Sequence, residues 1–174
     1  DPSWSPDASA LTFASEGSGT LGVLSLDPRA ATEGDTTEGE DDYDIYTVAA
    51  DGTGRKAITK STAADVGPAW GRSGLIAFES DRSGDEEIWV MAPDGSGATR
   101  VTRHDGWDGD PNWAPDASAI VYASERGGDS EIFTTSVDGR DTLQLTRNAV
   151  DDDGPAWSPD GKTIVFNSYA SGAW

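Results

Sequence analysis

Short runs in which apolar and polar residues alternate recur along the chain, and each run stops at a turn-forming residue. This alternation has the period of two that places successive side chains on opposite faces of a β-strand. The clearest runs begin at Leu11, Leu75, Ile120 and Ile164. No stretch of useful length has the 3.6-residue period of an amphipathic helix. The pattern therefore predicts an all-β protein built from short strands.

Tryptophan recurs in one local context, as the last residue of a Pro-x-Trp segment. The four copies of this segment end at Trp4, Trp70, Trp113 and Trp157. The last three are 43 and 44 positions apart, and a period of roughly 40 to 45 residues is typical of β-propeller blades. Trp4 lies 66 positions before Trp70, so the first repeat carries about 22 additional residues.

Each complete repeat continues with the same elements in the same order. A second apolar run is followed by an Asp-Gly pair, whose glycine tolerates the positive φ of a hairpin turn. A last short strand then closes the repeat. The sequence therefore predicts blades of four antiparallel strands, about three and a half of them in this chain. The predicted boundaries are residues 1–65 for blade 1 with an insertion at about 20–42, 66–108 for blade 2, 109–153 for blade 3, and 154–174 for half of blade 4.

The repeat unit also carries a family resemblance. It combines Pro-x-Trp-Ser-Pro-Asp-Gly with Ile-x-Phe-x-Ser-x-Arg-x-Gly, an Ile-aromatic strand, Asp-Gly and a closing Leu-Thr. This unit resembles the TolB-type β-propeller repeat, and residues 154–168 match it almost position for position. The resemblance implies four-stranded blades around a central channel. It leaves the function open, because the same repeat serves TolB, the propeller domains of prolyl-oligopeptidase-like and tricorn-like proteases, and secreted proteins.

Three and a half blades fall short of a closed propeller, which usually has roughly four to eight. A half-blade would leave a strand edge unpaired and an apolar face uncovered. Three explanations are open: the chain is part of a longer propeller, two chains combine into one ring, or the next subunit of a filament completes the open end. The sequence therefore predicts either an oligomer or part of a longer propeller.

The charge of the chain restricts its partners. Twelve basic and 32 acidic residues give a formal net charge of −20. This balance argues against nucleic acid and anionic membranes, which are bound through clusters of Lys and Arg, and it favours divalent cations. The absence of cysteine excludes disulfides and thiolate zinc sites. No apolar run approaches the roughly 20 residues needed to insert across a membrane.

Acidic residues in repeat register are the candidates for a metal site. Asp65, Asp108 and Asp152 each stand five positions before a repeat tryptophan, and Asp110 stands three before Trp113. Equivalent positions of successive blades form a ring on one face of a propeller, and Ca²⁺ takes about six to eight oxygen ligands. The alternative is that each aspartate caps a turn or pairs with an arginine of a neighbouring blade. For Arg82 and Arg126, which share a register, we expect such a pair with the adjacent blade.

Catalytic groups are not predicted in this chain. Asp44, Glu87 and Glu131 share a register, but repeat symmetry explains them without a glycosidase pair. There is no Gly-x-Ser-x-Gly segment, no cysteine and a single histidine, His104.

The sequence therefore predicts a non-catalytic module for protein binding or self-assembly, with calcium as a candidate stabilising ion. The family resemblance favours a periplasmic or extracellular location. The insertion at about 20–42 is the favoured element for contact with a partner, since loops on a rigid scaffold often carry binding functions. The alternative function is that of an accessory propeller domain of a hydrolase whose catalytic domain lies outside this chain.

Overall fold

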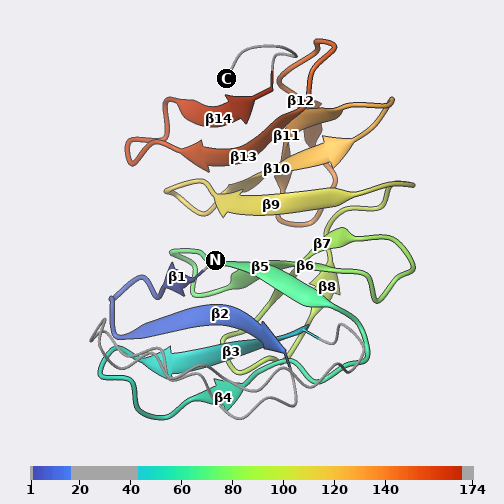
Figure 1. Cartoon of the computed structure of the whole chain (residues 1–174). Coiled ribbons are helices and arrows are strands. Elements are labelled where there is room, and N and C mark those ends of the chain that lie inside the picture. Colours follow the sequence, from blue (N-terminus) through green and yellow to red (C-terminus); the bar gives the residue numbers. More distant parts are fainter. Residues whose placement is uncertain (1, 17–42, 170–174) are drawn as a thin grey trace.

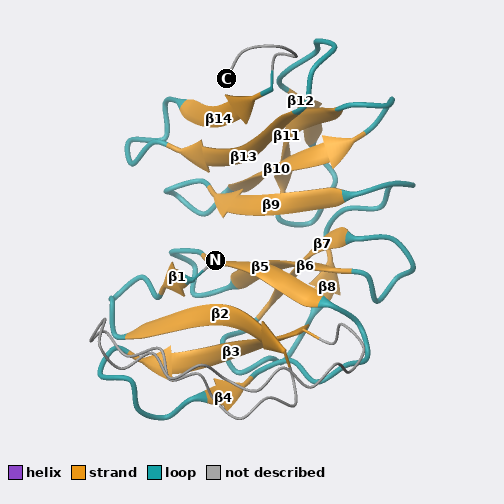
Figure 2. Ribbon diagram, viewed as in Figure 1, coloured by secondary structure: helices purple, strands orange, loops and turns teal. Residues whose placement is uncertain are grey.

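The chain folds into β-sheets stacked one on another. The computed structural model describes residues 2–16 and 43–169. All the secondary-structure elements in these ranges are β-strands (Figure 2). The first sheet contains β1 (Ser3–Trp4), β2 (Ala10–Glu16), β3 (Tyr43–Ala49) and β4 (Lys56–Ala57). The second contains β5 (Asp65–Trp70), β6 (Ile76–Ser80), β7 (Glu87–Met91) and β8 (Thr99–Arg100). The third contains β9 (Asp108–Trp113), β10 (Ala119–Glu125), β11 (Ser130–Ser136) and β12 (Thr142–Gln144). The last contains β13 (Asp152–Trp157) and β14 (Ile164–Ser168).

Within each sheet the strands follow one another in chain order. Each strand pairs antiparallel with the next. The first strands β1, β5, β9 and β13 contact one another, so they form the inner side of the stack (Figure 1). The all-β prediction and the prediction of four-stranded blades with a last half-blade are confirmed. The predicted insertion at about 20–42 lies outside the described residues.

A β-bulge interrupts the inner strand of three sheets at the same place. The register shifts just before the proline of each Pro-x-Trp segment, where proline has no N–H to donate to the ladder. The residue before that proline has a positive φ, 57° at Gly67, 54° at Asp110 and 56° at Gly154. Gly67 and Gly154 adopt this conformation without strain, because glycine has no Cβ. Asp110 adopts the same conformation although its Cβ makes it less favourable.

The hydrophobic core is divided into clusters between successive sheets. Because side chains alternate along β6, Phe78 packs toward the first sheet and Ala77 toward the third. Trp113 is 7% exposed in the cluster between the second and third sheets, and Trp157 packs against the cluster between the third and fourth. The aromatic residues therefore fill the space between successive blades.

The last sheet leaves apolar side chains exposed. All five residues of β6 are buried, whereas four of the five residues of β14 are exposed. Val165 is 61% exposed and Phe166 is 42% exposed. Within the described ranges, no strand pairs with the outer edge of β14. No helix of the described chain is long and apolar enough to cross a membrane.

Candidate binding groove and buried ion pairs

Two of the predicted calcium ligands belong to buried ion pairs. Asp65 is fully buried at the start of β5, directly across the β5–β6 pair from Ser80. Arg82 donates from Nη2 to both carboxylate oxygens of Asp65, at 2.6 and 2.7 Å. The Ser80 hydroxyl donates to Asp65 Oδ1 at 2.6 Å and accepts from Arg82 Nε at 2.8 Å. Asp65, Ser80 and Arg82 therefore form a closed, charge-assisted network.

The third sheet repeats this network with Asp108, Ser124 and Arg126. Ser124 donates to Asp108 Oδ1, and Arg126 Nε donates to the Ser124 hydroxyl at 2.8 Å. Arg126 Nη2 lies 3.5 Å from Asp108 Oδ2 and donates to the Tyr122 hydroxyl at 3.0 Å. Burial raises the pKa of Asp108, while the hydrogen bond from Ser124 and the charge of Arg126 oppose that rise.

The prediction that Arg82 and Arg126 pair with an aspartate of the adjacent blade is wrong. Arg82 and Arg126 each pair with an aspartate of their own sheet, not with one of the adjacent blade. The reason is the antiparallel register, which places Asp65 opposite Ser80 and Asp108 opposite Ser124. An arginine two residues beyond the serine reaches back across the same hairpin.

The other two predicted calcium ligands have different surroundings. Asp152 is fully buried opposite Ser168, and its Oδ2 accepts a hydrogen bond from Asn148 Nδ2 at 2.7 Å. Asp152 Oδ1 has no hydrogen-bond partner in the described structure. Asp110 lies at the bulge of β9, and its Oδ2 accepts from the Gly154 N–H at 3.1 Å. Among the described residues, no three His, Cys, Asp or Glu side chains lie close enough together to hold a metal ion.

The acids Glu87 and Asp44, at the start of β7 and in β3, have a structural role. Thr102, after β8, donates its hydroxyl to Glu87 and accepts from the Ile88 N–H at 2.9 Å. In the first sheet, the Thr59 hydroxyl donates to Asp44 Oδ1 at 2.9 Å. These threonines attach the end of each blade to its third strand. The register shared by these acids is therefore explained by hydrogen bonding within the blade.

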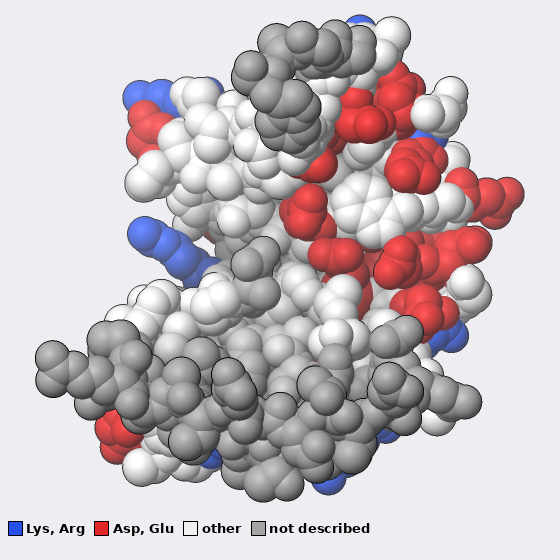
Figure 3. Space-filling view, in the orientation of Figure 1, with Lys and Arg blue, Asp and Glu red and all other residues white. Residues whose placement is uncertain are grey.

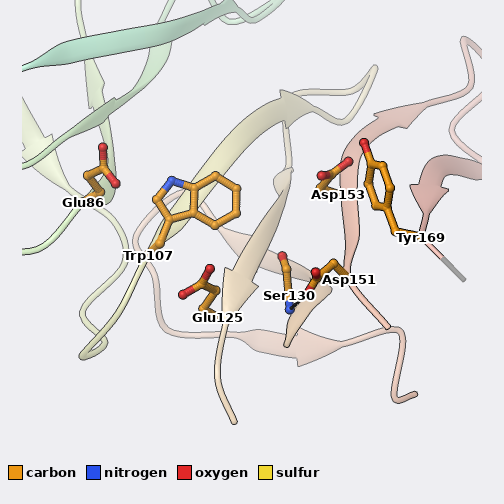
Figure 4. Close-up of a pocket in the computed structure, with 7 residues that line it drawn as sticks. All are labelled: Glu86, Trp107, Glu125, Ser130, Asp151, Asp153 and Tyr169. Carbon is orange, nitrogen blue, oxygen red and sulfur yellow. Dashed lines mark hydrogen bonds between the residues drawn. The ribbon is translucent and has the colours of Figure 1, made fainter. Parts of the chain in front are cut away.

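An acidic groove lies on one face of the molecule. The space-filling view shows acidic side chains gathered over one side of the visible face (Figure 3). The groove has a volume of about 580 Å³, and its lining residues come from the loops and strand ends of the last three sheets. They are Glu86, Trp107, Glu125, Ser130, Asp151, Asp153 and Tyr169. Figure 4 shows Trp107 between Glu86 and Glu125, with Asp153 and Tyr169 across the groove.

Glu86 and Glu125, two carboxylates of this groove, repel each other. Partial burial raises the pKa of Glu86, and the nearby charges of Asp81 and Glu125 raise it further. Asp151 is held in place, since its Oδ1 accepts from the Ser130 N–H at 3.0 Å. Lys and Arg are missing from the described residues that line the groove. The groove therefore favours a cation.

Glu79, at the inner side of the stack, lies beside Trp107, since both side chains border Gly109. The Asp110 N–H donates to Glu79 Oε1 at 3.0 Å. Glu79 is 7% exposed, and burial raises its pKa to about 7. It also borders an inner pocket of about 250 Å³ formed by the Pro-x-Trp segments. The indole of Trp107 passes over Gly109, where a Cβ would lie 2.1 Å from the Trp107 ring.

Sequence reasoning missed Trp107 and Glu79. Both residues interrupt the repeat, and this is the signal that could have found them. Trp107 stands just before Asp108, where the other repeats have Ala64 and Asp151. Glu79 stands just before Ser80, where the other repeats have alanine or asparagine. Trp107 packs against the cluster between the third and fourth sheets, but only this repeat has a tryptophan at that position, so the shared repeat pattern alone does not account for it.

Four-stranded antiparallel sheets stacked around adjacent first strands define the chain as part of a β-propeller. A family profile described as the TolB beta propeller domain matches residues 28–173. The chain therefore belongs to the TolB β-propeller family. A comparison with curated proteins gave no match.

Solved structures of similar fold include two TolB proteins. TolB from Acinetobacter baumannii has a TM-score of 0.76 and 22% identity over 99% of this chain and 38% of that chain. The putative TolB from Agrobacterium tumefaciens has a TM-score of 0.75 and 21% identity over 97% of this chain and 57% of that one. A puromycin-hydrolyzing peptidase of Mycobacterium tuberculosis has a TM-score of 0.70 and 13% identity, over 96% and 25% of the two chains. At these identities the likeness shows the fold, and this chain spans 38% and 57% of the two TolB chains.

Proposed function

We propose that this chain is a non-catalytic TolB-like propeller module that binds a protein partner. In this proposal, the acidic groove takes a Lys or Arg side chain from a basic segment of that partner. The observation that carries the proposal is the position of Trp107, whose ring lies in a groove lined by four carboxylates. Those carboxylates belong to Glu86, Glu125, Asp151 and Asp153.

The chemistry of the groove matches a cationic side chain. A cation over the face of an indole gains roughly 0.5 to 2 kcal/mol, with the larger values in sites that exclude water. Glu86 and Glu125 stand on either side of Trp107 and repel each other. A bound cation removes that repulsion, so binding gains from both the ring and the carboxylates. Interactions of this kind weaken as salt is added.

Calorimetry with two synthetic peptides tests the proposal. One peptide is rich in Lys and Arg. The other has the same sequence, except that each basic residue is replaced by glutamine. We expect the basic peptide to bind the wild-type chain, and the neutral peptide to show no measurable binding. The double variant E86Q/E125Q should bind the basic peptide about tenfold more weakly, which corresponds to about 1.4 kcal/mol.

A matched variant separates the groove from the net charge of the chain. D138N/D160N also removes two carboxylates, at the exposed turn residues Asp138 and Asp160. Asparagine retains the side-chain oxygen that accepts the turn hydrogen bonds there. If the two double variants lose the same affinity, the basic peptide responds to overall charge and the groove is not the site.

The remaining parts of the proposal concern location and assembly. The family resemblance and the net charge of −20 support a periplasmic or extracellular location, which cell fractionation tests. The exposed apolar residues of the last sheet support assembly with a partner chain or a further copy, which light scattering tests.

The alternative, an accessory propeller of a hydrolase, gains support if the gene encodes a hydrolase domain beside these repeats.

A further inference from the structure

We propose that the acidic groove holds two cationic groups at once, in two subsites about 10 Å apart. The groove therefore selects a partner segment that carries two basic side chains three positions apart. The proposal rests on the proposed function, since it specifies the basic segment that the same groove receives. The repeat pattern of the residues that line the groove carries it.

Six of the seven lining residues occupy three positions of the repeat, and each position is filled twice. The first position lies just before the acid of the third strand. The second lies just before the buried aspartate of the next sheet, and the third lies just after the serine opposite that aspartate. The first set of residues at these positions is Glu86, Trp107 and Glu125, and the second set is Ser130, Asp151 and Tyr169.

The backbone holds the two sets in the same way. In the first set, the Glu125 N–H donates to the Trp107 carbonyl at 2.9 Å. In the second set, the Tyr169 N–H donates to the Asp151 carbonyl, also at 2.9 Å. The two sets are therefore copies of one local structure, displaced by one step of the repeat. Because stacked sheets lie about 10 Å apart, the two sets are separated by about that distance.

Each set places one aromatic ring near carboxylates, although at different positions of the repeat. In the first subsite the ring is Trp107, which lies between Glu86 and Glu125 (Figure 4). In the second subsite the ring is Tyr169, and Asp153 lies on the same side of the groove (Figure 4). A cation gains free energy from the face of a ring and from a nearby carboxylate. Each subsite therefore provides for one cation, and a ligand with a single charge leaves the other subsite unused.

The second subsite is open because of its position in the repeat. Tyr169 is 50% exposed. The residue at the same position is also exposed in the complete second and third sheets, where it is Asp81 and Glu125. This position therefore faces solvent in all three sheets, and the ring of Tyr169 is accessible to a ligand in the same way as the carboxylate of Glu125.

The distance between the subsites selects a particular arrangement of charges. In a polyproline II segment, which has about three residues per turn, residues three positions apart lie on the same side and about 9 Å from each other. Two lysines at this spacing reach both subsites, whereas two adjacent lysines point in different directions. Binding at one subsite raises the effective concentration of the second lysine at the other. The lining has four carboxylates and, among its described residues, no Lys or Arg, so its charge matches such a ligand.

Calorimetry with three proline-rich peptides tests the proposal. The first peptide has two lysines three positions apart, the second has the same two lysines side by side, and the third has one lysine. We expect the first peptide to bind the wild-type chain at least about tenfold more tightly than either of the others. The D153N variant should lose most of this preference. D138N, with the same change of charge at an exposed turn, should retain it.

The Y169A variant provides a second measurement if D153N fails to fold. It should also lose the preference, while it binds the one-lysine peptide as tightly as the wild type does. Equal affinity of the wild-type chain for all three peptides would overturn the two subsites and leave the proposed function standing, whereas binding of none of them would overturn both. Competition by spermidine, a free linear polyamine, as strong as by the first peptide would overturn the partner segment as the occupant.

Discussion

At the residue scale, one aspartate of the repeat has different partners in different blades. Asp65 and Asp152 are both fully buried at the start of an inner strand, and each lies opposite a serine. Arg82 neutralises Asp65, whereas Asp152 receives a hydrogen bond from Asn148. The same substitution should therefore have opposite consequences at these two positions.

D65N should reduce the free energy of unfolding by about 1 to 3 kcal/mol, because it leaves the Arg82 guanidinium without its carboxylate. D152N should leave the stability unchanged or increase it, because it removes a buried charge that no described basic side chain neutralises. Urea denaturation of both variants measures this difference. A loss of stability in D152N as large as that in D65N would show that Asp152 is neutralised in the folded chain.

Glu79 should make the stability of the protein depend on pH. Burial raises the pKa of Glu79 to about 7, compared with an ordinary value of 4.5. Between these values the folded chain binds a proton that the unfolded chain has released. The stabilisation from that proton is complete below pH 4.5 and is lost as the pH rises through about 7.

The E79Q variant isolates this effect, since glutamine resembles the protonated acid. We expect E79Q and wild type to be similar in stability at about pH 5, and E79Q to be more stable by about 1 to 3 kcal/mol at about pH 8. Denaturation at a series of pH values measures the difference. A difference that does not change with pH would mean that Glu79 titrates at its ordinary value in the folded protein.

At the element scale, the blades could be predicted from the sequence and the groove could not. Each blade is specified by local signals, such as the Pro-x-Trp segments and the Asp-Gly turns, which repeat within roughly 45 residues. The groove combines loops from separate sheets, so its residues are far apart in the chain. The partner of Arg82 was also predicted in the wrong blade. Asp65 lies opposite Ser80 because β5 pairs with β6, and the spacing of residues in the sequence does not reveal this pairing.

The Gly109→Ala substitution tests the element that holds Trp107. A Cβ at this position would lie 2.1 Å from the Trp107 ring and 2.8 Å from Glu79 Oε2, so the indole must move. We expect a changed near-UV circular dichroism spectrum and about tenfold weaker binding of the basic peptide.

Gly52→Ala serves as the control for Gly109→Ala. Gly52 has a φ of 81° and nothing within 4 Å of an added Cβ, so this change introduces backbone strain without touching the groove. It should reduce stability while retaining the affinity for the basic peptide. Loss of binding in both variants would attribute the effect to reduced stability.

At the scale of the whole molecule, the net charge of −20 favours bound cations. Calcium binding stays a prediction for the four aspartates, of which Asp65 and Asp108 already have arginine partners. We expect calcium to raise the midpoint of thermal unfolding above its value in chelator, since a ligand of the folded state alone stabilises it. Magnesium at the same ionic strength is the control. If magnesium raises the unfolding midpoint as much as calcium does, the effect is general screening of charge and not a calcium site.

The groove around Trp107 is the proposed site for a basic partner, and the other proposed properties of the groove depend on it. The most direct measurement is a titration of the nitrogen-15-labelled chain with the basic peptide, followed through the indole N–H signals of its seven tryptophans. The account predicts that the signal of Trp107, assigned from the spectrum of the Trp107→Phe variant, shifts most and that added salt reverses the shift. Shifts confined to other tryptophans, or a spectrum that does not respond to the peptide, would contradict it.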